Sequence, residues 1–293
     1  MKLNSRRTIL TGLAFLSICA FWQMYDSVIP LILTKTFHMN ETFSGAIMAA
    51  DNVLALFLLP FFGARSDKTN TKIGKRMPYI LFGTGCAVIL MNLLPLIDNS
   101  YTAAPSGFKT ASFVIVLGLL LVAMGTYRSA AVALMPDLTP KPLRSHANAI
   151  INLMGAVGGI LYLAVAAVLY SQKRLDAMGL TKADRLDYQP LFLIVSAIMF
   201  VSVGILFLTI KEPRLAKESQ QLEAQHPEWN LAETDATGTE VLPKPVRRSL
   251  GFLLASIALW FMGYNGVTTW FTTYVSRVMG EGLGGASTCL LVA

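Results

Sequence analysis

Charged residues are scarce in this chain of 293 residues. Asp, Glu, Lys and Arg make up 14% of it, hydrophobic residues make up 54%, and the mean hydropathy is +0.55. An ordinary soluble domain carries about 25% charged and about 45–50% apolar residues. The shortage of charge therefore argues against an ordinary soluble domain and indicates a membrane protein.

Cysteine and histidine are also few. Cys19, Cys86 and Cys289 are an odd set, each inside or beside an apolar run, which excludes a disulfide framework or a cysteine metal site. The three histidines fall in loops or at the ends of apolar runs, with no metal spacing and no Ser/His/Asp arrangement. The sequence therefore predicts no catalysis and no cofactor.

Acids are fewer than bases, 17 against 24, and the formal net charge is +7. A basic chain can bind nucleic acid. Here, however, the bases sit between apolar runs rather than on an amphipathic face. The lipid bilayer is the expected partner, and nucleic acid is not.

In contrast to these scarce residue types, long apolar runs are abundant in the chain. A bilayer needs about 20 apolar residues as a helix, and only helices and closed barrels satisfy every backbone group in lipid. Seven runs qualify, and 282–293 would begin an eighth: 8–33, 43–63, 78–97, 113–134, 147–170, 190–210 and 250–275. The first run follows "MKLNSRR" as a secretory signal would, but its length and its polar residues indicate an uncleaved span. The predicted fold class is an all-α polytopic membrane protein.

The loops predict the topology and the domains. Most Lys and Arg fall in inner loops if the N-terminus is cytoplasmic, which predicts a multi-pass protein of the cytoplasmic membrane. Residues 211–248 are polar and Pro-punctuated, and predict a flexible cytoplasmic linker that is helical in its first third. The expected units are a six-span bundle at 1–210, this linker, and the incomplete start of a second bundle at 249–293.

The first and seventh spans have similar sequences. The first contains "AFWQMYDSV" and the seventh contains "ALWFMGYNGV". Repeated halves are a known way to build a transporter. Chance similarity between two apolar helices is the alternative.

Two loops carry a resemblance. After the second run the chain reads "GARSDKTNTKIGKRMPYI", and after the fourth "MPDLTPKPLRSHANAIINLMG", with Asp137 and Arg144. Together they resemble the major facilitator superfamily, and within it the glycoside-pentoside-hexuronide symporters and sucrose-type transporters. That family normally has twelve spans. The resemblance therefore implies a C-terminally truncated chain that does not transport alone, and a monomer when full length.

The first loop would act as a cytoplasmic latch between the two halves. By resemblance, its residues are Gly63, Asp67, Gly74, Lys75 and Arg76. The glycines allow close approach, and the charges can hold carboxylates or helix ends. A topology signal, with bases kept inside, is the alternative.

Three charged residues fall inside spans: Asp26, Asp51 and Arg128. Such residues mark functional sites by default, and a desolvated carboxylate can exchange a proton near neutral pH, as a proton-coupled carrier needs. Their heights make a direct Asp26–Arg128 pair unexpected, and Asp51 reaches Arg128 only if span tilt or the span boundaries allow it. Structural roles are the alternatives: a hydrogen-bond lock, an interfacial carboxylate and a charge partner.

The sodium site of the melibiose-permease group is not carried over. That group has two acids before the Pro of a Pro-x-x-Gly motif, where this chain has Ala55 and Leu59 before Pro60. The proton is the expected coupling ion, and Na⁺ stays open.

Polar and aromatic residues of the first, fourth and seventh spans would line the central cavity by resemblance, and the fifth span adds two amides. Sugars suit such a set, because their hydroxyls take hydrogen bonds and their C–H faces pack on rings. Interfacial aromatics and amides that hold spans together are the alternative. Besides the three charges, the candidates are Trp22, Gln23, Tyr25, Tyr127, Asn148, Asn152, Trp260, Tyr264 and Asn265.

Glycines gather in the fifth span, where "GAVGG" contains Gly155, Gly158 and Gly159. Small residues at this spacing let two membrane helices approach closely. The run predicts close packing or a hinge.

The predicted function is secondary active transport of a sugar or glycoside, by proton symport with alternating access. Efflux of amphiphiles is a rival, although the polar candidates argue mildly against it. A non-transporting membrane sensor or interaction protein is another. A membrane enzyme is a third, but it lacks a visible catalytic arrangement.

Overall fold

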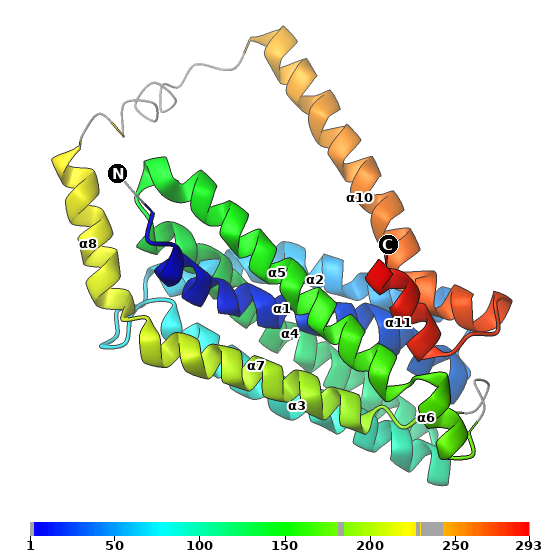
Figure 1. Ribbon diagram of the computed structural model, residues 1–293. Helices are drawn as coiled ribbons and strands as arrows, with labels where there is room; N and C mark the ends of the chain where they lie inside the picture. Colours follow the sequence, from blue (N-terminus) through cyan, green and yellow to red (C-terminus); the bar gives the residue numbers. More distant parts are fainter. Residues whose placement is uncertain (1–2, 181–184, 227–228, 230–242, 293) are drawn as a thin grey trace.

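A computed structural model describes residues 3–180, 185–226, 229 and 243–292 (Figure 1), and this part of the chain contains helices and no strand. The helices run in this order: α1 (Ser5–Leu31) with its π-helical continuation η1 (Ile32–Thr36), α2 (Glu41–Asp67), α3 (Met77–Ala103), α4 (Gly107–Leu138), the 3₁₀ turn η2 (Lys141–Leu143), α5 (Arg144–Leu169), α6 (Gln172–Ala177), α7 (Gln189–Thr209), α8 (Glu212–Gln225), α10 (Lys244–Val278) and α11 (Leu283–Val292). Seven are long and apolar enough to cross a membrane, as the seven runs predict, and α11 is a shorter apolar helix where the eighth run is expected to begin.

The spanning helices up to α7 lie side by side as a bundle (Figure 1). α1 is the most buried of them and packs against α5, α7 and α4. Its side chains Phe21, Met24 and Tyr25 are fully buried, with Tyr127 and Tyr162 from facing helices. α2 packs mainly on α4, and few of its residues are fully buried.

Glycines bring α1 and α5 together, as "GAVGG" predicts. A Cβ at Gly158 would overlap the backbone of Leu16, and a Cβ at Gly155 would lie 2.9 Å from Cys19 Sγ. In lipid, the hydrophobic effect does not drive helices together, so close van der Waals packing between small residues stabilises their contact instead. The prediction of close packing is confirmed.

The bundle has two ends. The N-terminal end holds the start of α1, the α2–α3 turn, the α4–α5 turn and α8, and the far end holds η1, the α3–α4 turn and α6 (Figure 1).

The segment predicted as a linker is partly helical. Its first third forms α8, as expected, and α8 docks against the N-terminal end of the bundle. α10 begins at Lys244, inside the same segment, and residues 227–228 and 230–242 lie outside the described residues. α10 runs away from the bundle and meets it only near its own end, where Thr272, Thr273 and Val275 are buried (Figure 1).

Candidate functional site

A small hollow of about 10 Å³ between α1, α2 and α4 brings Trp22, Asp51 and Arg128 together. Its remaining walls are apolar: Leu54, Ala55, Leu58, Leu59, Leu121 and Gly125. The Arg128 guanidinium carbon lies 5.8 Å from the centre of the Trp22 ring, a cation–π distance. Asp51 thus reaches the neighbourhood of Arg128, which the sequence left dependent on span tilt and boundaries.

Asp26 extends this charged region along α1. It is half-buried, and its carboxylate lies within electrostatic range of Asp51. Asp51 accepts hydrogen bonds from the backbone N–H and side-chain amide of Asn52, at 2.6 and 2.8 Å. Within the described residues, neither Asp26 nor Asp51 nor Arg128 forms an ion pair. In particular, no Asp26–Arg128 pair forms, in agreement with the heights of the two residues.

Tyr127 and Tyr25 do not face the hollow, although the sequence grouped them with its lining residues. Tyr127 has no exposed surface, and its hydroxyl hydrogen-bonds to Ser17 Oγ at 2.5 Å and to the carbonyl oxygen of Ala14 at 3.0 Å. Tyr25 is also buried, with its ring against those of Phe21 and Trp22. Tyr127 thus joins α4 to α1 through its hydroxyl, whereas the rings against Tyr25 belong to its own helix.

The other candidates lie elsewhere. Gln23 is directed toward α5, where its Oε1 lies 3.9 Å from the place of a Cβ on Gly159. Asn148 and Asn152 are exposed on α5. Trp260, Tyr264 and Asn265 are exposed along α10, with the Trp260 and Tyr264 rings stacked 5.7 Å apart. The structure does not bring these α10 residues to the hollow, because that stretch of α10 leaves the bundle.

The two motif loops form one cluster at the N-terminal end. Arg76 is only 4% exposed and donates to Asp137 at 2.9 Å and to Asp67 and Ser66. Lys75 pairs with Asp137 at 3.1 Å. The Gly63 carbonyl oxygen accepts a longer bond from Arg76, at 3.4 Å. A buried guanidinium with several acceptors is a strong, geometry-dependent link.

Glu212 completes this cluster, and sequence reasoning missed it. Its carboxylate, at the start of α8, accepts the backbone N–H groups of Lys75, Arg76 and Met77 at 2.8–2.9 Å. It therefore caps the positive end of α3. Gly74 has φ +122°, and a Cβ there would overlap the Glu212 carboxyl group. A glutamate just before a proline at a helix start was visible in "KEP", but its partner lies far away in sequence.

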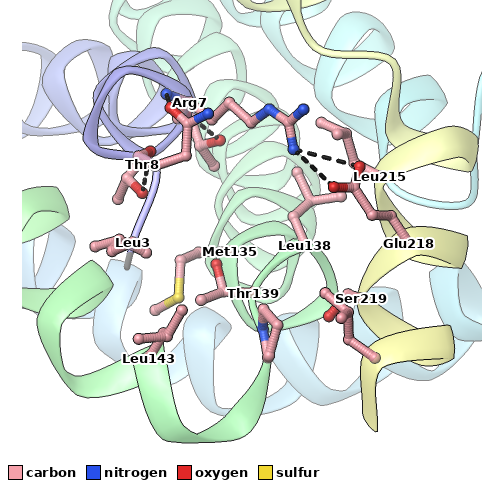
Figure 2. Close-up of a pocket in the computed structure, with 14 residues that line it drawn as sticks. Leu3, Arg7, Thr8, Met135, Leu138, Thr139, Leu143, Leu215, Glu218 and Ser219 are labelled. Carbon is pink, nitrogen blue, oxygen red and sulfur yellow. Dashed lines mark hydrogen bonds and ion pairs between the residues drawn. The ribbon is translucent and has the colours of Figure 1, made fainter. Parts of the chain in front are cut away.

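Two further acids fasten α8. The Glu223 carboxylate accepts hydrogen bonds from the Arg144 side chain at 3.2 Å and from the Lys141 backbone N–H at 3.0 Å. Arg144 thus links the second motif loop to α8. Figure 2 shows Arg7 directed at Glu218, 3.3 Å away, across a cavity of about 280 Å³ between α8, the start of α1 and the end of α4. α8 is thus tied to the starts of α3, α1 and α5.

The model of the Major Facilitator Superfamily matches residues 11–293. The chain belongs to that superfamily. Among curated proteins, "Sucrose transport protein SUC3" of Arabidopsis thaliana is 32% identical over 139 residues, 43% of this chain and 23% of the relative. "Sucrose transport protein SUT3" of Oryza sativa subsp. japonica is 27% identical over 170 residues, 52% of this chain and 33% of the relative.

A solved structure has the same fold. It is the inward-open conformation of the xylose transporter XylE from E. coli, with a TM-score of 0.58 and 15% identity. The match covers 98% of this chain and 66% of XylE. The chain therefore spans about two thirds of that protein, and its matches cover a third or less of the sucrose transporters.

Proposed function

We propose that this chain contributes the first helical bundle of a secondary active transporter for a sugar or glycoside. The observation that carries the proposal is that Trp22, Asp51 and Arg128, from three different helices, meet around this small hollow. A carboxylate and a guanidinium hydrogen-bond to sugar hydroxyls, and an indole packs on the C–H face of a sugar ring. The sucrose and xylose transporters among the relatives support this substrate class.

Proton symport is the proposed coupling. Asp26 and Asp51 are carboxylates in membrane helices, close enough for the charge of one to affect the other. A shared or exchanged proton is the simplest way to reduce such repulsion in a low-dielectric site. Binding of the sugar beside Asp51 would then change the proton occupancy of the pair.

Alternating access would use the Arg76 cluster as its latch. In this proposal the N-terminal end of the bundle faces the cytoplasm, in a cytoplasmic membrane, and the full transporter acts as a monomer. Arg76, Asp67 and Asp137 would hold the inner ends of the helices in one state and be released in another.

Proteoliposomes test the proposal, with sucrose and xylose as probes. The full transporter that contains this bundle is reconstituted with a pH-sensitive dye inside, because this chain is not expected to transport alone, and each sugar is added outside without a pH gradient. Inward proton movement that follows one sugar, and that Asp51→Asn strongly reduces, is the expected result. Sugar accumulation without proton movement would contradict symport, and sugar binding without accumulation would favour the sensor.

A further inference from the structure

A second buried ion pair lies at the far end of the bundle, away from the hollow and the Arg76 cluster. Asp98, in the last turns of α3, has no exposed surface, and its Oδ2 accepts a hydrogen bond from Arg185 Nη2 at 2.6 Å. Arg185 belongs to the segment that leads into α7, 87 residues along the chain. The Arg185 side chain is 29% exposed, so the pair is closed on the acid side and reachable on the basic side.

The pair sits where four helices end. From α3, Asn99 accepts from Arg185 at 2.8 Å and donates to Asp187 at 2.9 Å. Asp187 also accepts the Gln189 backbone N–H at the start of α7, at 3.0 Å, and its carbonyl oxygen accepts from Tyr170 at the end of α5, at 2.8 Å. The π-helix η1, which ends α1, places Thr36 beside Asp98.

The charge of Asp98 determines whether these contacts between α3 and the segment before α7 are stable. The groups that face Asp98 are Thr36 from η1, Asn99 from its own helix, and Arg185, Asp187 and Tyr188 from the segment before α7. Of the described residues that face Asp98, Arg185 is the only one with a positive charge. Removing one partner of a buried ion pair is strongly destabilising, because the other charge is left uncompensated. Protonation of Asp98 does this without any change of sequence.

We propose that Asp98 and Arg185 form a charge-dependent clamp, which holds the segment before α7 against the far ends of α1 and α3 and opens when Asp98 is neutral. The clamp bears on the hollow through η1, which continues α1 without a break beyond Trp22 and Asp26. A π-helical turn is rare, and such turns occur frequently at functional sites. This last consequence, control of the position of α1, rests on the proposed transport function, but the clamp itself does not.

Hydrogen–deuterium exchange tests the clamp on the complete chain in lipid nanodiscs, without substrate. The readout is the peptide covering residues 185–192, with rates corrected for the intrinsic effect of pH. Asp98→Asn should speed its exchange by about tenfold, the equivalent of about 1.4 kcal/mol, and Arg185→Gln should do the same. The matched control is Asp176→Asn, a change to an exposed acid on α6 that should leave the peptide unchanged.

Two comparisons make the test decisive. The charge-swapped variant, Asp98→Arg with Arg185→Asp, should restore slow hydrogen–deuterium exchange in the 185–192 peptide. A purely steric role of Asp98 would not allow this recovery. The wild type should approach the fast rate on acidification, and the double variant Asp98→Asn with Arg185→Gln should show no such pH step. Unchanged exchange in both single variants, or a pH step that persists in the double variant, would overturn the clamp. Because no sugar is present, either result is independent of whether the protein transports one.

Discussion

Glu212 accepts the backbone N–H of Arg76 at 2.9 Å, although 136 residues separate them in the sequence. The same carboxylate holds the neighbouring N–H groups of Lys75 and Met77. The side chain of Arg76 is thereby free to reach Asp67 and Asp137. The cluster around Arg76 is thus completed by Glu212, the first residue of α8.

Replacement of Glu212 tests this relationship. Glu212→Gln puts an amide donor against the N–H groups of α3 and removes the charge that the helix end favours. We expect the thermal unfolding of the protein in lipid to show a loss of about 1–3 kcal/mol. The matched control is Glu218→Gln, which breaks the half-exposed pair with Arg7 and should cost about 1 kcal/mol or less. Equal losses in the two variants would contradict the capping role.

The α1–α5 contact gives a second prediction. Gly158→Ala places a Cβ against the Leu16 backbone, which cannot move aside as a flexible side chain can. We expect a loss of roughly 1–3 kcal/mol in unfolding free energy. Gly118→Ala on α4 is the control, because a Cβ there meets nothing within 4 Å. Gly118→Ala should be neutral or slightly stabilising, since alanine favours a helix more than glycine does.

Asp51 should carry sugar binding or coupling. Asp51→Asn removes the carboxylate from the hollow and leaves a side chain of similar size. We expect sugar-driven proton uptake to fall about tenfold or more, because a charged hydrogen bond is worth about 1.5–3 kcal/mol. Asp176→Asn, at the exposed acid of α6, should leave uptake unchanged. Full activity of Asp51→Asn would remove this residue from the proposed mechanism.

Variants at Trp22 and Tyr127 should distinguish a residue that binds sugar from one that packs helices together. Trp22→Ala removes the ring beside Arg128, worth about 0.5–2 kcal/mol, so sugar affinity should fall severalfold. Tyr127→Phe removes only the hydroxyl that bonds to α1, so stability should fall by about 1 kcal/mol while affinity stays unchanged. Isotherms of sugar binding and thermal unfolding of both variants make the comparison. A drop in affinity for Tyr127→Phe would place its hydroxyl at the sugar after all.

Neighbouring residues on α4 explain why site prediction from sequence was only partly successful. Tyr127 is buried against α1, and Arg128, the next residue, is exposed toward the hollow. A soluble helix would reveal its inner face by an apolar stripe. In a membrane both the packed face and the lipid face are apolar, so the pattern does not say which way each residue points.

The sequence by itself determined the properties that depend on local composition. Scarce charge and seven long apolar runs require membrane helices, and the motif around Asp67 and Arg76 identifies the superfamily. Only the tertiary structure decided which distant residues meet: Glu212 with Arg76, Asp98 with Arg185, and Asp51 beside Arg128. The physical reason is that hydropathy fixes how long each helix is. The partners of a side chain depend instead on how each helix is rotated and how closely it packs, and that is set by contacts between residues far apart in the chain.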